Sequence, residues 1–233
     1  MIKTPALLLM LLYGVVMWAF SAWRLKGQLD RQSTELVDPR LTPVLDRMAA
    51  ALDLPKIRVN VFEVDPVNGL AAPDGRIFVT RGFYRKVQTG EITPEEMASV
   101  VAHELGHVAL GHARRRLVDF SGQNAIRVVL SGVLGRIIPG VGVWVANMLA
   151  TLVAARLSRQ DEFEADAYAA ALMTRAGIGV GPQKTLFEKL GKMTGMGGAG
   201  VPAWLMSHPK AEERIAAIEA LEARWRGGAV EGP

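Results

Sequence analysis

The stretch VVAHELGHVALGH, residues 100–112, places two histidines and a glutamate inside an otherwise apolar, helix-favouring sequence. His103 and His107 are four residues apart, so on a helix their imidazoles lie on one face and can bind the same metal ion. Glu104 lies beside that face, where a carboxylate can reach a metal-bound water without binding the metal, as a general base must. The alternative is a pair of histidines satisfied by hydrogen bonds on a partly buried helix. Chemistry at this position therefore depends on a third ligand.

The sequence just after this pair supplies no third histidine ligand. A catalytic zinc ion usually has three protein ligands and one open position for water. Metzincins carry a glycine three residues after the second histidine and a third histidine three residues later, but those positions are Leu110 and Ala113 here. His112 has the wrong offset and suits a helix cap or the surface. The chain has no cysteine, so any metal site must be built from histidines and carboxylates.

Residues 158–173, SRQDEFEADAYAAALM, bring four carboxylates into an alanine-rich helical sequence: Asp161, Glu162, Glu164 and Asp166. Glu162 and Asp166 are four residues apart and share one helix face. We expect Glu162 to bind the metal. Asp166 is expected to accept a hydrogen bond from the outer nitrogen of a ligand histidine, which fixes the tautomer of that ring. An exposed acidic helix without a metal has the same spacing, so this reading stays open.

The elements around these residues predict a mainly helical α+β fold with a small sheet. Alternating apolar residues at 56–64 and the sequence RIFVT at 76–80 indicate two strands, which we expect to form a small antiparallel sheet. A helix with a capping box is expected over residues 94–118, and a second long helix over residues 145–176. The two helices carry all the candidate ligands.

Residues 4–23 pass without a charge and are long enough, at about 30 Å as a helix, to cross the hydrocarbon core of a bilayer. Trp18 and Trp23 lie towards the end of this run, where interfacial aromatics are expected. A cleaved signal peptide is the alternative, but the aromatic residues crowd its cleavage site, so an uncleaved transmembrane anchor is favoured. Basic residues flank the run almost equally, which leaves the side of the membrane open.

A second apolar run, residues 137–155, also contains no charge. It is either another membrane element or a buried helix. Arginines bracket it closely, which favours the buried helix: Arg127, Arg136 and Arg156.

The length of 233 residues suits one domain with appendages. We expect an anchor at 4–23, a polar linker at 24–37, one catalytic domain at 38–226 and a short tail at 227–233. The formal charge is only +4, and the basic run at 114–116 has no interleaved aromatic residues. A solvated helix end explains that run, so we expect no nucleic-acid partner.

Several motifs together resemble the M48 family of zinc metallopeptidases. HELGHVALGH, followed by EFEAD from Glu162 onwards, resembles the metal-binding motifs of that family. NGLAAPDGRIFVTRGFY (68–84) is similar to the segment in which an edge strand lines the substrate cleft. SHPKAEERIAAI (207–218) resembles the downstream His-Pro and Arg-Ile signature. The likeness covers roughly residues 38–222 and implies a zincin-like catalytic domain.

The resemblance implies one zinc ion per chain, held by His103, His107 and Glu162, with Glu104 as general base and Asp166 supporting the metal ligands. His208 matches a histidine beside the zinc, which either stabilises the oxyanion or closes the water position, and Arg214 matches an arginine of the same region. The strand around Ile77, Phe78, Val79 and Thr80 would hold peptide substrates by β-augmentation.

We therefore expect a membrane-anchored zinc endopeptidase that acts on misfolded or unassembled proteins. The chain lacks the multiple clear spans of CAAX-processing relatives, so prenylated substrates are not expected. A single-pass protein of a bacterial inner membrane fits best, with lipid contacted through the N-terminal helix. The alternative is a latent enzyme, or a non-catalytic membrane chaperone or adaptor, with a zinc site closed by His208.

Overall fold

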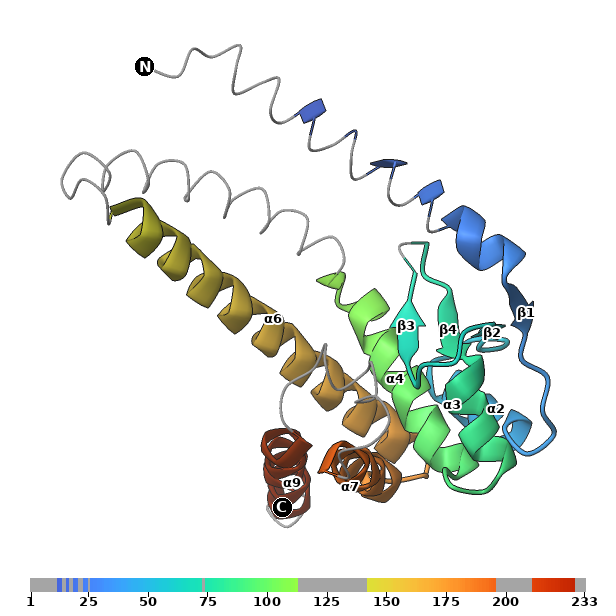
Figure 1. The fold of residues 1–233 in the computed structure, drawn as a ribbon. Coiled ribbons are helices and arrows are strands. Elements are labelled where there is room, and N and C mark those ends of the chain that lie inside the picture. The colour runs from blue at the N-terminus through green and yellow to red at the C-terminus, as the bar shows by residue number, and fades with distance from the viewer. Residues whose placement is uncertain are drawn as a thin grey trace. The chain divides into compact units, whose positions relative to one another are not determined.

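The computed structural model of the chain describes residues 12–13, 16, 19–20, 23–24, 26–72, 74–112, 142–195 and 211–228. The described elements are mainly helices with one small sheet (Figure 1), which confirms the predicted α+β class. The chain divides into two units, residues 1–31 with 111–160 and residues 32–110 with 161–233. The predicted ligand residues on the two motif helices all belong to the second unit.

The sheet has four strands in the order β1-β2-β4-β3, formed by Ser33–Glu35 (β1), Val59–Phe62 (β2), Gly69–Ala71 (β3) and Ile77–Thr80 (β4). β4 pairs parallel with β2 and antiparallel with β3, and β1 pairs antiparallel with β2. The sheet is therefore mixed, and the prediction of an antiparallel sheet is wrong.

The reason lies in the segment between β2 and β4, which contains the additional strand β3. After β2 the chain forms β3 at the far edge and then folds back through a tight turn as β4. The turn is closed by hydrogen bonds from Ala72 N–H to the Arg76 carbonyl and from Gly75 N–H to the Ala72 carbonyl, with Gly75 at φ +84°. β4 therefore returns between β2 and β3, in the direction of β2.

The central strand β4 is buried, whereas the edge strand β1 is not. All four residues of β4 are buried, which fits a strand that is covered on both faces. β1 lies at the opposite edge to β3 and is formed by Ser33, Thr34 and Glu35, none of which is buried. These residues fall in the predicted 24–37 linker, and their polar composition is also what an exposed edge strand requires.

Six helices complete the described structure: Thr42–Ala51 (α2), Arg81–Gln88 (α3), Pro94–Ala109 (α4), Gly142–Arg175 (α6), Gly181–Gly195 (α7) and Ala211–Gly228 (α9). α4 begins with the predicted capping box, in which the Thr93 hydroxyl accepts from Glu96 N–H and the Glu96 carboxylate accepts from Thr93 N–H. It ends at Ala109 and not at 118, because Gly111 at φ +67° stops the helix. α6 agrees with its prediction to within three residues.

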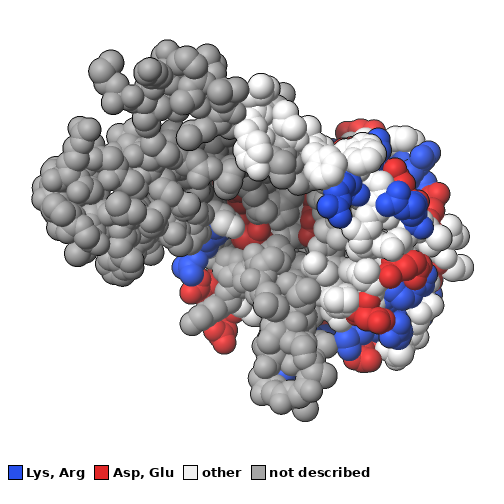
Figure 2. All heavy atoms as spheres, turned by 45° about the horizontal axis from the view of Figure 1, so that its top comes forward, with Lys and Arg blue, Asp and Glu red and all other residues white. Residues whose placement is uncertain are grey.

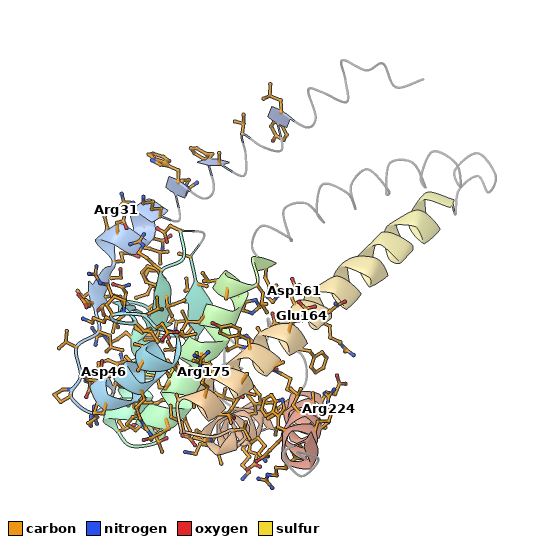
Figure 3. The ribbon with its side chains drawn as sticks, turned by 180° about the vertical axis from the view of Figure 1, so that it is seen from behind. Arg31, Asp46, Asp161, Glu164, Arg175 and Arg224 are labelled. Carbon is orange, nitrogen blue, oxygen red and sulfur yellow. The ribbon has the colours of Figure 1, made fainter. Side chains whose placement is uncertain are left out.

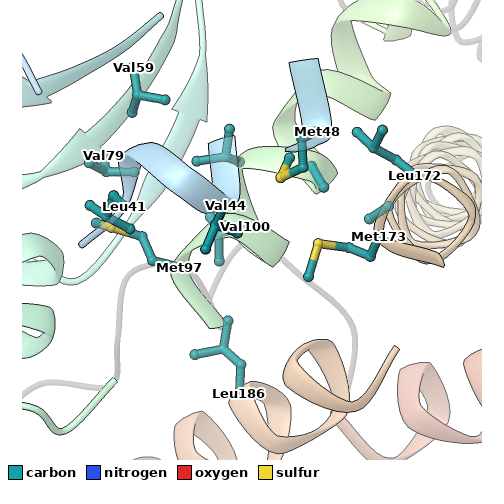
Figure 4. Close-up of a cluster of buried hydrophobic side chains, with 14 of the residues drawn as sticks. Leu41, Val44, Met48, Val59, Val79, Met97, Val100, Leu172, Met173 and Leu186 are labelled. Carbon is teal, nitrogen blue, oxygen red and sulfur yellow. The ribbon is translucent and has the colours of Figure 1, made fainter. Parts of the chain in front are cut away.

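The core surrounds α4. Apolar side chains from α2, the sheet, α4, α6 and α7 pack into one cluster (Figure 4). Among them, Met97 and Val100 of α4 lie in the same cluster as Val79 of β4 and Leu186 of α7. α4 is thus held by the sheet and by other helices along most of its length.

A close helix crossing brings α6 to α4. A Cβ atom on Gly106 would lie 3.1 Å from both the Cα and the carbonyl oxygen of Ala165, which is tighter than ordinary packing. Glycine and alanine at this crossing allow the two backbones to approach. The crossing places the carboxylates of α6 within reach of the histidines of α4.

Across the described residues, the structure contains no helix that is both long and apolar enough to cross a membrane. The predicted anchor at 4–23 lies mostly outside the described residues. The predicted apolar run at 137–155 is helical from Gly142 onwards, and its side chains are outside the described part. His208 and most of the tail at 227–233 also lie outside it.

Candidate metal centre

His103, His107 and Glu162 converge on one point between α4 and α6. The Nε2 atoms of the two histidines are 3.1 Å apart. The Glu162 carboxylate lies 3.3 Å from Nε2 of His103 and 3.5 Å from Nε2 of His107. In a tetrahedral zinc site with bonds of about 2.0–2.2 Å, neighbouring ligand atoms are about 3.3–3.6 Å apart. The two Glu162 distances involve different oxygens, Oε2 to His103 and Oε1 to His107, so the three side chains lie close to the spacing of such a site without forming its exact triangle.

The other carboxylates of the acidic segment do not join this group. Asp161 and Glu164 lie on the same part of α6 (Figure 3), but the ligand atoms that meet His103 and His107 belong to Glu162. Of the four carboxylates, Glu162 is the one whose oxygens lie beside both histidines.

Asp166 orients the ring of His103. Its Oδ1 lies 2.9 Å from Nδ1 of His103, and both side chains are buried. A carboxylate needs a donor in this position, so Nδ1 carries the proton and the Nε2 lone pair is turned towards Glu162 and His107. This is the arrangement that the sequence predicted for Asp166.

The carboxylates around His103 favour positive charge at this ring. Burial alone would lower the pKa of His103, but hydrogen bonds to Asp166 and Glu162 outweigh burial and raise that pKa to about 9. A metal ion bound at Nε2 would be stabilised by the same negative charges.

Glu104 lies beside the three ligands and is not one of them. Burial raises the pKa of its carboxyl above the ordinary value, although the neighbouring His103 and His107 oppose the shift. The backbone N–H of Ala71 in β3 also opposes the shift and lowers the pKa of Glu104. A buried carboxylate with a raised pKa next to a metal site is suited to accept and return a proton near neutral pH.

A glycine allows β3 to lie this close to Glu104. A Cβ atom on Gly69 would lie 2.5 Å from Cγ1 of Val100 and 3.5 Å from Oε1 of Glu104. Val100 is β-branched and buried on α4, so it has little freedom to move. Only glycine lets the strand pack here.

The predicted substrate strand, β4, is not at an edge of the described sheet. β4, formed by Ile77, Phe78, Val79 and Thr80, has strand partners on both sides, so its backbone offers no edge to a peptide. β3 is the terminal strand on the Glu104 side. Expecting the peptide edge at 77–80 was therefore wrong, because the sequence did not reveal the intervening strand.

Hydrogen bonding shows which groups of β3 face outwards. Thr80 N–H donates to the Asn68 carbonyl, and Ala72 N–H donates to the Arg76 carbonyl. In an antiparallel pair these bonded positions alternate with positions that turn their N–H and C=O away from the partner strand. Gly69 and Ala71 occupy the outward positions.

Arg214 lies in the region that the resemblance implied, behind the ring of His103. Its guanidinium is fully buried, lies 4.2 Å from the centre of the Phe187 ring and forms a two-pronged ion pair with Asp166. It is 3.3 Å from Nδ1 of His103, on the side of the ring away from Nε2. Arg214 therefore supports Asp166 from behind the ligands and does not face the position where a substrate carbonyl would lie.

Gln183 is a site residue that the sequence analysis missed. Its Nε2 lies 3.3 Å from the backbone oxygen of Asp166 and 3.5 Å from Oδ1 of the same residue. The signal that was available is Gly181-Pro182, because proline in the first turn starts a helix and places Gln183 at its buried beginning.

Comparison with known proteins agrees with this geometry. The model of "Peptidase family M48" matches residues 35–222. The chain is 31% identical over 157 residues to the metalloprotease LoiP of Escherichia coli (strain K12), covering 66% of this chain and 59% of LoiP. It is 25% identical over 228 residues to a protease HtpX homolog of Chlorobium phaeobacteroides, covering 84% of this chain and 74% of that protein. The chain thus spans less than two thirds of the length of LoiP.

Proposed function

The chain belongs to peptidase family M48 and is a zinc metallopeptidase, and we propose that it is a membrane-anchored endopeptidase acting on misfolded or unassembled proteins. The observation that carries this proposal is the meeting of His103, His107 and Glu162 beside Glu104 and the outward edge of β3. Metal ligands, a proton carrier and a peptide-binding edge then lie at one place.

In this proposal His103, His107 and Glu162 hold the zinc ion. Zinc bound there would polarise the scissile carbonyl and make water a stronger acid. Glu104 accepts the proton of the attacking water and passes it to the leaving amine. Asp166 keeps Nδ1 of His103 protonated throughout, so that its Nε2 stays available to the metal. His208 is proposed to lie beside the zinc on the basis of the resemblance alone.

The peptide would lie along β3. Outward N–H and C=O groups of Gly69 and Ala71 can pair with an extended backbone, and such pairing is largely indifferent to side chains. An extended backbone is exposed in unfolded proteins and hidden in folded ones. This geometry supports misfolded or unassembled proteins as the substrate class.

The anchor would be the apolar run at 4–23. The large hydrophobic side chains that the structure describes within this run are all exposed: Leu12, Tyr13, Val16, Phe20 and Trp23. Exposed apolar side chains at successive helical positions suit contact with lipid. This supports a protein that acts at a membrane surface.

The visible charged surface suits proteins better than nucleic acids. Lys and Arg side chains are interspersed with Asp and Glu on the described face in Figure 2. Several of the cations form ion pairs with neighbouring acids, for example Arg81 with Glu63 and Lys86 with Glu91. A protein surface that binds nucleic acid would instead have Lys and Arg side chains grouped along a stripe.

The full chain in detergent tests this proposal. It is incubated with casein, with a stably folded protein, and with the same protein chemically unfolded. We expect internal cuts in casein and in the unfolded form, and none in the folded form. Trimming from the chain ends alone, or equal cleavage of folded and unfolded protein, would contradict the endopeptidase and its substrate class. Release of the chain from membranes by alkaline carbonate would contradict the anchor.

Replacing Ala71 by proline is expected to raise KM for casein by about 10- to 100-fold, because the outward N–H is lost in the edge strand. A fall in kcat alone would instead point to Glu104, which the same N–H faces. Proline is tolerated where a strand N–H has no ladder partner, so the thermal midpoint of unfolding should change little. Ala71→Ser keeps the N–H and is the matched control. If the serine and proline variants have equal activity, β3 does not hold the substrate.

A further inference from the structure

We infer that Gln183 is a positioning residue of the metal centre, which acts by fixing Asp166 and, through it, the ring of His103. This inference rests on the proposed zinc site. Gln183 lies on α7 and contacts Asp166, which in turn contacts the ring of His103. Three helices then hold one ligand histidine of α4 in place: α6, α7 and α9.

Asp166 is the point where these helices meet. Its Oδ1 lies 2.9 Å from Nδ1 of His103 and 2.5 Å from an Nη atom of Arg214, and its Oδ2 lies 2.6 Å from Nε of Arg214. Nε2 of Gln183 approaches the same Oδ1 at 3.5 Å and the backbone oxygen of Asp166 at 3.3 Å. The amide of Gln183 therefore spans the backbone and the side chain of one residue.

The orientation of the Gln183 amide follows from its neighbours. Both atoms of Asp166 that it approaches are acceptors, so the nitrogen must face them. Spanning the backbone oxygen and Oδ1 restricts rotation of the Asp166 side chain. Arg214 fixes the second carboxylate oxygen, and Oδ1 then stays in line with Nδ1–H of His103.

Burial argues against a purely packing role for Gln183. The residue is 1% exposed, and its Oε1 meets no hydrogen-bond donor among the residues that the structure describes. A buried amide oxygen without a donor destabilises a fold, whereas a methionine of similar shape would fill the same space without that penalty. What glutamine supplies, and methionine does not, is the N–H group that holds Asp166.

The test is the metal affinity of the full chain carrying Gln183→Met. Loss of a partner behind a ligand histidine typically weakens metal binding by about 10- to 100-fold. We expect a loss of this size for zinc, measured by competition with a chromophoric chelator, and an altered visible absorption spectrum of bound Co²⁺. The metal-free variant is expected to be at least as stable to heat as the wild type.

Two further variants separate positioning from stability. Leu186→Val leaves a small cavity elsewhere in α7 and should lower stability with zinc affinity unchanged. Gln183→Glu keeps the shape but replaces the donor with an acceptor, and should also weaken zinc binding. If both Gln183 variants bind zinc as tightly as the wild type, the inference is overturned. Absence of zinc binding in the wild type would instead remove the proposed site itself.

Discussion

Glu104→Gln is expected to lower the rate of casein cleavage by about 100- to 10,000-fold, with zinc affinity close to that of the wild type. General acid–base catalysis contributes rate factors of this size, and glutamine cannot carry the proton. Glu104 lies outside the group formed by the three ligands, so its replacement should leave them in place. Glutamine has nearly the same size and shape as glutamate, so the packing around this position should be kept.

Two measurements on the same preparation decide this prediction. Zinc content is determined by elemental analysis, and cleavage by the rate of new amino termini released from casein. A variant that keeps both zinc and full activity would remove Glu104 as the proton carrier. A variant that loses zinc would show that Glu104 helps to hold the metal.

Glu162→Gln is expected to weaken zinc binding by at least about 100-fold and to abolish cleavage at low zinc concentrations. The replacement removes the only negative charge from the group formed by Glu162, His103 and His107. A neutral amide oxygen is a poorer zinc ligand than a carboxylate, and a site with two histidines alone lacks the third ligand that catalytic zinc requires. The side chain keeps its size, so the crossing of α4 and α6 should remain.

Glu164→Gln is the matched control for this variant, because it lies on the same helix but groups with His112 and Asp161 instead of His103 and His107. Zinc affinity of the site at His103 and His107 should equal that of the wild type. Equal zinc affinity in Glu162→Gln and the wild type would show that the third ligand is another residue. Weak binding in both variants would point to the net charge of α6 as the cause.

The grouping of the candidate ligands could be predicted because their geometry is local to each helix. His103 and His107 share a helix face at a spacing of four, and so do Glu162 and Asp166, so the periodicity alone shows which side chains point together. The capping box at Thr93 fixed the start of α4 in the same way. The sequence did not show how closely the two helices would cross, which depends on Gly106 and Ala165.

The sheet was harder to predict because pairing is not a local property. Alternation of apolar residues identified β2 and β4, but it is the same for parallel and antiparallel neighbours. β3 has three residues, Gly69 to Ala71, which is too short for alternation to reveal it. Missing this strand reversed the predicted pairing and moved the peptide edge to the wrong strand.

The supporting residues behind the ligands were predicted least well. Arg214 lies on α9 and Gln183 on α7, and only the packing of these helices against α6 brings them to Asp166. The spacing of residues within one helix does not show how that helix packs against another. A resemblance in motifs placed Arg214 in the region of the metal centre but did not show that it pairs with Asp166 behind His103.

The most direct test of the account is the activity of the metal-free full chain as zinc is added in steps. If the site at His103, His107 and Glu162 carries out the hydrolysis, casein cleavage should be absent without metal and rise in proportion to zinc. The rise should stop at one zinc ion per chain, and Glu104→Gln should bind the same amount without cleaving. Cleavage by the metal-free chain, or a rise that does not follow occupancy of this one site, would contradict the account.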